Sequence, residues 1–258
     1  MLDLGSLREY REARRFARRT GREPKDFAVA RGAHLDMLPA HVDPHAGLVL
    51  DLGANEGDWT EAMLAVFPGV EVLAVEPGDD PRAKLEARFA DVPNVTVKSC
   101  AMSDHSGTAT YHRTRASVFA SLLPPREDLD EIYPLHGGPT AVLETVEVET
   151  ATLDELVGAR PVSVLKLDVQ GGELAVLRGG AETLARTAAV LVEVLFVPHY
   201  EGDATFPLLH EAMVSLNLEL IDMSKPFRLG EGPALWADAC YCRRPPADPS
   251  DSPASADG

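Results

Sequence analysis

One short stretch, residues 49–59, constrains the fold of this chain more than any other. It reads V-L-D-L-G-A-N-E-G-D-W, so an apolar run ends at Asp51 and three turn-forming residues follow: Gly53, Asn55 and Gly57. Apolar residues then recur at helical spacing. A buried strand, a glycine turn and a helix together bring the backbone close to a nucleotide-like ligand. The stretch therefore predicts the first unit of an α/β sheet with a ligand at its edge.

The spacing of the glycines separates two classes of cofactor. Dinucleotide-binding turns follow G-x-G-x-x-G, and here the third glycine is missing. A short-chain reductase would also usually carry Tyr-x-x-x-Lys, which this sequence lacks. The acid Asp51 precedes the glycines, which favours S-adenosylmethionine over NAD. A second acid, Glu76, follows Gly57 by 19 residues, where a carboxylate can accept hydrogen bonds from two ribose hydroxyls.

Strand and helix patterns alternate from residue 48 onward. We expect strands at 48–51, 70–76, 95–99, 162–168 and 189–196, with helices at 81–90, 173–184 (interrupted at Gly179-Gly180) and 206–216. Such nearly continuous apolar strands indicate a parallel sheet that is covered on both faces. Two further strands, at 218–223 and 236–242, resemble an antiparallel hairpin. The predicted fold is α/β and Rossmann-like, with a mostly parallel seven-stranded sheet, an antiparallel C-terminal hairpin and helices on both faces.

Three regions are expected along the chain. Residues 1–46 contain a basic helix at 6–20 and a linker with one further helix around 26–34, and residues 47–244 form the sheet domain. Residues 107–150 interrupt this domain with two strand-like pieces around a loop rich in Ser, Leu and Pro, a common place for substrate specificity. Residues 245–258 carry no large apolar side chain and are expected to be disordered.

Charge and composition restrict the classes of partner that this chain is expected to bind. The net charge is −17, although residues 1–34 hold nine Lys/Arg against five Asp/Glu. An acidic body argues against nucleic-acid binding, which depends on phosphate neutralisation by Lys and Arg. No apolar run approaches the roughly 20 residues of a membrane span. The first residues lack an apolar signal core, and three cysteines suit a reducing compartment. We expect a cytoplasmic protein without nucleic-acid or membrane partners; the oligomeric state stays open, a homodimer included.

Ligands of open parallel sheets bind beyond the carboxyl ends of the strands. The candidate site residues at these ends are Asp51, Gly53, Asn55 and Gly57 after the first strand, Glu76 after the second, Asp104 after the third, Asp168 after the fourth, and Glu193 and His199 at the fifth. A charge at Asp168, which caps a buried strand before two glycines, needs a partner or a function.

Five segments together resemble the FkbM family of methyltransferases. They are D-L-G-A-N-E-G (51–57), V-E-P (75–77), L-K-L-D-V-Q-G-G-E (165–173), V-L-R-G-G-A (176–181) and E-V-L-F-V-P-H-Y-E-G (193–202). The resemblance covers about residues 47–242, and the serine-rich stretch at 116–123 is similar to a serine-leucine segment of the family. It implies a class I methyltransferase that uses S-adenosylmethionine to methylate hydroxyls, often on sugars or polyketide-derived natural products.

The resemblance also assigns roles to the candidate residues. Gly53, Asn55 and Gly57 would lie along the amino-acid part of the cofactor. Glu76 would hold the ribose and Asp104 would face adenine. Asp168 would lie near the methyl-transfer centre. The implied acceptor is a hydroxylated small molecule.

Methyl transfer to an alcohol requires alignment and removal of a proton. Candidate bases are Asp168, Glu193 and His199, of which His199 is the most natural proton acceptor near neutral pH. A divalent metal held by Asp168 and Glu193 is an alternative that no H-x-x-H pair supports, and we expect none. N-methylation or protein methylation on the same fold, and a non-catalytic cofactor-binding protein, remain open; an Asn/Asp-Pro-Pro-Tyr signature of amino-group transfer is absent.

Overall fold

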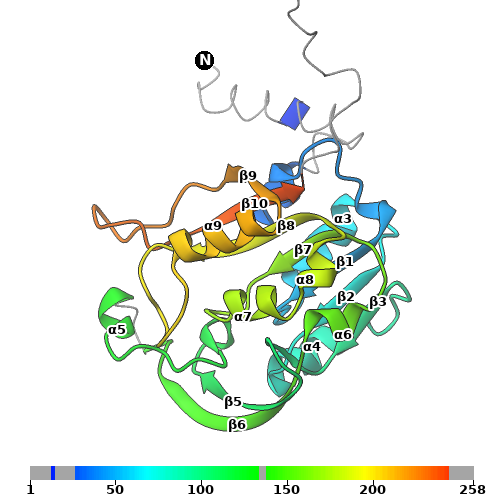
Figure 1. Cartoon of the computed structure of the whole chain (residues 1–258). Helices are drawn as coiled ribbons and strands as arrows, with labels where there is room; N and C mark the ends of the chain where they lie inside the picture. The colour runs from blue at the N-terminus through cyan, green and yellow to red at the C-terminus, as the bar shows by residue number, and fades with distance from the viewer. Residues whose placement is uncertain (1–12, 15–26, 134–137, 244–258) are drawn as a thin grey trace, which may run out of the picture.

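The computed structural model describes residues 13–14, 27–133 and 138–243. A seven-stranded sheet lies between two layers of helices (Figure 1). Its strands are β1 (Leu48–Leu52), β2 (Val72–Val75), β3 (Val95–Lys98), β7 (Val162–Leu167), β8 (Thr187–Leu195), β9 (Leu218–Met223) and β10 (Trp236–Arg243). The main helices are α2 (Phe27–Gly32), α3 (Asp58–Val66), α4 (Asp79–Phe89), α6 (Leu153–Val157), α7 (Glu173–Arg178), α8 (Ala181–Leu184) and α9 (Phe206–Ser215).

The order of the strands is β3-β2-β1-β7-β8-β10-β9. All neighbours pair in parallel except β10, which lies between β8 and β9 and is antiparallel to both. The predicted mostly parallel seven-stranded sheet is therefore confirmed, and the predicted hairpin forms. Because β9 runs antiparallel to β10, it has the same direction as the other strands. The chain reverses its direction across the sheet between β1 and β7, which makes their carboxyl ends the topological switch point.

Both faces of the sheet are buried, as the unbroken apolar strands predict. Leu50 packs with Met213 of α9 on one face, where α6, α7 and α8 also lie. Val49 packs with Met63 of α3 on the other face, together with α2 and α4. All four of these side chains have no exposed surface. The alternation of side chains along a strand explains how neighbours such as Val49 and Leu50 serve opposite layers.

The insertion forms a small sheet of its own. Its strands are β4 (Ala101–Met102), β5 (Gly107–Thr114) and β6 (Val142–Ala151), in the order β4-β6-β5. β5 and β6 pair antiparallel, which confirms the two predicted strand-like pieces. The short elements η4 (Ser117–Phe119) and α5 (Leu129–Ile132) lie between them in the sequence. The small sheet lies beyond the main sheet, at the bottom of Figure 1.

The N-terminal region is described only in part. Of the helix predicted at 6–20, the structure describes Ala13 and Arg14, which are helical, and Ala13 is buried in the α3 side of the core. The helix predicted around 26–34 is present as α2, followed by η2 (Leu35–Met37). The tail predicted at 245–258 lies outside the described residues. Within the described ranges, no helix has the length and apolarity that crossing a bilayer requires.

Shortening one central side chain tests the core. Leu165 of β7 is fully buried between the layers, so Leu165→Ala should lower the free energy of unfolding by about 2–5 kcal/mol. Leu143, of which 62% is exposed, is the matched control, and its alanine variant should change stability by less than about 0.5 kcal/mol. Urea denaturation measures both. Equal effects of the two substitutions would contradict this placement of the core.

Candidate active site

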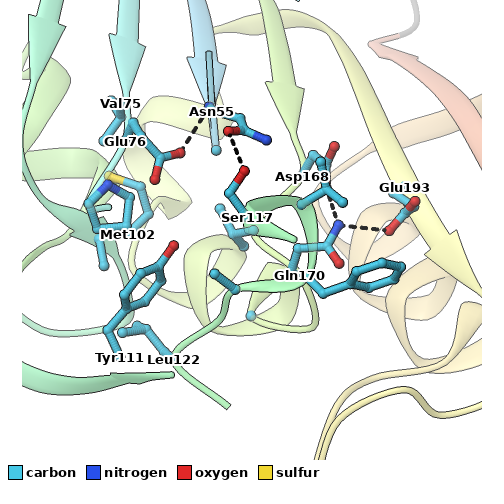
Figure 2. Close-up of a pocket in the computed structure, with 18 of the residues that line it drawn as sticks. Asn55, Val75, Glu76, Met102, Tyr111, Ser117, Leu122, Asp168, Gln170 and Glu193 are labelled. Carbon is cyan, nitrogen blue, oxygen red and sulfur yellow. Dashed lines mark hydrogen bonds between the residues drawn. The ribbon is translucent and has the colours of Figure 1, made fainter. Parts of the chain in front are cut away.

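A cavity of about 370 Å³ opens at the switch point, beyond the carboxyl ends of β1, β2, β7 and β8 (Figure 2). Gly53, Asn55 and Glu76 line one end of it. Glu193 and His199 line the other. The insertion and the loop between β9 and β10 supply the remaining walls. The structure thus brings together most of the residues that the strand ends predict.

The glycine turn lets two loops touch. Gly53 has φ 81°, and a Cβ added there would lie 1.8 Å from the carbonyl oxygen of Asp168. Only glycine therefore allows the loops after β1 and β7 to meet. Gly57 has φ 89° and is the N-cap residue of α3, where an added Cβ would lie 2.6 Å from the Phe89 ring. Gly57 serves the packing of α3 on α4 and does not line the cavity.

Glu76 is fixed at the end of β2 by two backbone donors. Its Oε2 accepts a hydrogen bond from the Asn55 N–H at 2.9 Å, and its Oε1 accepts one from the Gly78 N–H at 2.8 Å. Burial raises the pKa of Glu76, and these two N–H groups oppose the rise. Each carboxylate oxygen keeps a free lone pair, because ionised carboxylates offer about four acceptor positions. Glu76 can therefore accept from two neighbouring hydroxyls of a ligand.

Asp51 lies at the end of β1 but does not line the cavity. Its side chain has no exposed surface, and Oδ2 accepts a 2.6 Å hydrogen bond from the Thr60 hydroxyl. Among the described residues, Oδ1 has no hydrogen-bond partner. Burial raises the pKa of Asp51, and the charge of Lys166 opposes this. The carboxyl group is thus a buried support under the turn, with one acceptor position unused.

Asp104 lies apart from the other predicted residues. Its side chain is 42% exposed and its Oδ1 is 2.6 Å from the His105 ring. The hydrogen bond from His105 lowers the pKa of Asp104. Cys100, Ala101 and Met102 line the cavity at this strand end, and Asp104 does not. The adenine contact of Asp104 stays a prediction that the cavity geometry does not support.

Asp168, Gln170 and Glu193 form a cluster toward the Glu193 end of the cavity (Figure 2). The Gln170 side-chain amide donates to Asp168 Oδ1 at 2.7 Å and to Glu193 Oε2 at 3.3 Å. Lys166 Nζ donates to Asp168 Oδ2 at 2.9 Å. Burial raises the pKa of Glu193, and the negative charge of Asp168 raises it further. One amide therefore bridges two carboxyl groups, of which only Asp168 also has a cationic partner in direct contact.

Gln170 was not predicted from the sequence, although its contacts are the most specific in the cavity. Its φ of 57° lies in the left-handed region, which is uncommon for a residue other than glycine. Tyr200 donates its hydroxyl to Gln170 Oε1 at 2.6 Å, and Ser121 donates to the Gln170 carbonyl oxygen at 2.6 Å. The sequence feature that could have indicated Gln170 is its position as an amide residue directly before Gly171-Gly172, at the end of a strand.

His199 lines the cavity as predicted, but its ring already has a partner. Its Nε2 is 3.1 Å from the Tyr133 hydroxyl, and its backbone N–H donates to Asp203. Burial lowers the pKa of His199 to about 4. The imidazole is therefore neutral near pH 7 and is a weaker proton acceptor than an ordinary histidine.

The insertion closes the cavity with polar and aromatic contacts. Ser117 donates its hydroxyl to Asn55 Oδ1 at 3.0 Å, so the serine-rich segment is bonded to the glycine turn. Tyr133 stacks on Phe227 with centroids 6.4 Å apart, and Phe227 stacks on Trp236 at 5.1 Å. These three rings form an aromatic wall at the Glu193 end of the cavity. The insertion thus reaches both ends of the site.

Glu173 supports the loop that carries Asp168 and Gln170. Only 4% of this residue is exposed, and its Oε1 accepts from the backbone N–H groups of Val169 at 3.0 Å and Gly171 at 3.3 Å. Burial raises the pKa of Glu173 to about 7. Among the residues that the structure describes, no group of three His, Cys, Asp or Glu side chains is arranged to hold a metal ion.

The order of the strands, the single antiparallel strand and the cavity at the switch point define a class I methyltransferase fold. The sequence profile of the methyltransferase FkbM domain matches residues 51–221. The chain belongs to this family, as its motifs predicted.

Two curated relatives are named as methyltransferases. The 2-O-methyltransferase NoeI of Sinorhizobium fredii (strain NBRC 101917 / NGR234) is 27% identical over 184 residues, which cover 66% of this chain and 72% of NoeI. The 31-O-demethyl-FK506 methyltransferase FkbM of Streptomyces tacrolimicus is 31% identical over 156 residues, which cover 51% of this chain and 58% of that protein. Among solved structures, Aeropyrum pernix fibrillarin with natively bound S-adenosyl-L-methionine is 13% identical, with a TM-score of 0.43 over 76% of this chain and 66% of fibrillarin.

The raised pKa of Glu173 predicts a pH-dependent stability. The folded state holds this proton up to about pH 7 and the unfolded state only to its ordinary 4.5, so stability falls as pH rises through this window. Glu173→Gln keeps a neutral acceptor for both N–H groups. The stability of this variant relative to the native protein should therefore rise by roughly 2 kcal/mol between pH 5 and pH 8 in urea denaturation. A stability difference between the two proteins that does not change with pH would show that the pKa of Glu173 is not raised.

Proposed function

We propose that the protein transfers a methyl group from S-adenosylmethionine to a hydroxyl of a small natural product or sugar. Residues 47–244 would carry this activity. One observation carries the proposal: a single cavity has a glycine turn with Glu76 at one end and the Asp168–Gln170–Glu193 cluster at the other. A donor and an acceptor can meet end to end between them.

The residues present fit the cofactor. The turn at Gly53 exposes backbone without a side chain, which suits the amino-acid part, and the two oxygens of Glu76 suit a ribose diol. Met102 and Tyr111 line the same end and offer an apolar and an aromatic surface for adenine. When bound, S-adenosylmethionine would supply a methyl group on a good leaving group. The acids Asp51, Glu76 and Asp168 would favour this cation over its neutral product.

The protein's own contribution is alignment and proton removal. We assign the base to Glu193, which would accept the proton of the acceptor hydroxyl during methyl transfer. Its raised pKa makes it a stronger base than an ordinary carboxylate, whereas His199, with a pKa of about 4, is weaker. Asp168, held by Lys166 and Gln170, would orient the acceptor. His199 and Tyr133 would position it from the side of the aromatic wall.

The relatives support oxygen as the accepting atom. NoeI is named for 2-O-methylation, and FkbM of Streptomyces tacrolimicus is named for methylation of 31-O-demethyl-FK506. Both names place the methyl group on an oxygen atom. Transfer to nitrogen or to a protein is the alternative activity on the same fold, and cofactor binding without catalysis is a separate outcome of the methyl-transfer test.

The central test is transfer of a labelled methyl group to a panel of hydroxylated compounds, detected by mass spectrometry with and without EDTA. We expect transfer in both conditions, with a rate that rises with pH as Glu193 loses its proton. Glu193→Gln should lower kcat by about 10²–10⁴-fold, the range for general bases, and remove this pH dependence. Exposed Glu211→Gln on α9 is the matched control. Full activity of Glu193→Gln would contradict the assignment of Glu193 as the base. Cofactor binding without methyl transfer would contradict the proposed enzymatic activity.

Calorimetry tests the cofactor end separately. Glu76→Ala should weaken S-adenosylmethionine and S-adenosylhomocysteine by about 10–100-fold each, because it removes charged acceptors for a diol. Glu86→Ala, an exposed substitution on α4, should change neither. Asp104→Ala decides the remaining assignment: weaker binding would place Asp104 at the adenine, and unchanged binding would remove it from the site. Unchanged affinities for Glu76→Ala would contradict the proposed orientation.

A further inference from the structure

We propose that the acceptor is larger than the ring that carries the methylated hydroxyl, and that its polyhydroxylated remainder binds in a second cavity beside the acid cluster. An oligosaccharide or glycoside fits this description. The proposal rests on the proposed function and adds a subsite to it.

The second cavity has a volume of about 710 Å³. Its walls come from three elements: the α2–η2 segment with His34, the loop from Asp222 to Gly230, and the start of β10 with Asp238. Phe227 and Trp236, which stack on each other, line this cavity and the catalytic cavity alike. The two cavities are therefore neighbours across one pair of aromatic rings.

The pairing of β8 with β10 shows how close the two cavities are. Glu193 and Asp238 are directly opposite each other in the antiparallel pair, where facing Cβ atoms lie about 5 Å apart. Glu193 lines the catalytic cavity and Asp238 lines the second one. Asp238 is held from the other side by His34 at 3.0 Å. An acceptor whose hydroxyl reaches Glu193 can thus continue into the second cavity within the width of one strand.

The cavity volumes indicate that part of a larger acceptor must lie outside the catalytic cavity. The catalytic cavity of about 370 Å³ is at the low end of the roughly 300–1,000 Å³ that one drug-sized ligand occupies. The cofactor is itself a ligand of that size, so little room remains beyond one ring. A third hollow of about 480 Å³ also adjoins the catalytic cavity, but it is lined by Gly78, Lys84 and Tyr111 at the cofactor end. Of these two hollows, the second cavity lies beside Glu193, through Asp238.

The chemistry of the second cavity favours hydroxyl groups. Charged side chains of both signs line it: the basic Arg31, Lys225 and Arg228, and the acidic Asp36, Asp222 and Asp238. Ser224 also lines it, and Phe227 and Trp236 form an aromatic border. Hydroxyls donate and accept hydrogen bonds, so they can pair with both signs, and a sugar face can lie on an aromatic ring. An acyl chain would require an apolar lining, and a polyanion would meet the three carboxylates beside the three cations.

A length series of acceptors tests the subsite. Methyl glycosides of glucose, galactose and N-acetylglucosamine, each as mono-, di- and trisaccharide, are incubated with labelled S-adenosylmethionine and analysed by mass spectrometry. We expect kcat/KM to be about tenfold higher or more for trisaccharides than for monosaccharides. Equal values, or no transfer to any glycoside while calorimetry shows that S-adenosylmethionine binds, would overturn the subsite. Absence of both cofactor binding and transfer would instead overturn the proposed function.

A variant that fills the second cavity locates the effect. Lys225 is exposed and lines this cavity, so Lys225→Trp should raise KM for the trisaccharide about tenfold. The monosaccharide KM and the dissociation constant of S-adenosylmethionine should stay unchanged. Lys98→Trp, on the exposed side of edge strand β3, is the matched control. An equal effect of Lys225→Trp on both acceptors, or no effect on either, would contradict the subsite.

Discussion

The contact between two loops at the switch point is the constraint on which the site depends. Gly53 and the carbonyl of Asp168 approach so closely that no other residue fits at position 53. This contact places the glycine turn after β1 beside Asp168 in the loop after β7. Because each loop is anchored at a central buried strand, their separation is fixed by the sheet and not by the loops themselves.

The site also depends on one cation, Lys166, which contacts its neighbouring carboxyl groups unequally. Lys166 lies among carboxylates, and the charges of Asp168 and Asp51 outweigh the effect of burial and raise its pKa. Glu193, which lacks such direct contact with Lys166, has a raised pKa. One cation thus places two acids that are bridged by the same Gln170 amide in different electrostatic environments, which is the basis of the different roles proposed for them.

The sequence predicted the sheet well because its strands are apolar on both faces and its turns contain glycine. The lining of the cavity was predictable where a residue lies at a strand end, as at Glu76, Asp168 and Glu193. It was not predictable where two distant segments meet. The left-handed Gln170 depends on Ser121 and Tyr200, and the low pKa of His199 depends on its burial beside Tyr133. Neither the conformation of a non-glycine residue nor the burial of a histidine is visible in residue spacing.

The position of β10 in the sheet has a consequence for how the molecule assembles. It is the last strand among the described residues, yet it fills an interior place between β8 and β9. Until it inserts, β8 is an open edge, Trp236 is absent from the walls of both cavities, and Asp238 is absent from the wall of the second cavity. During synthesis the Gly53–Glu76 end of the first cavity can therefore form well before its Glu193 end, and the nascent chain exposes an unpaired strand edge until β10 emerges.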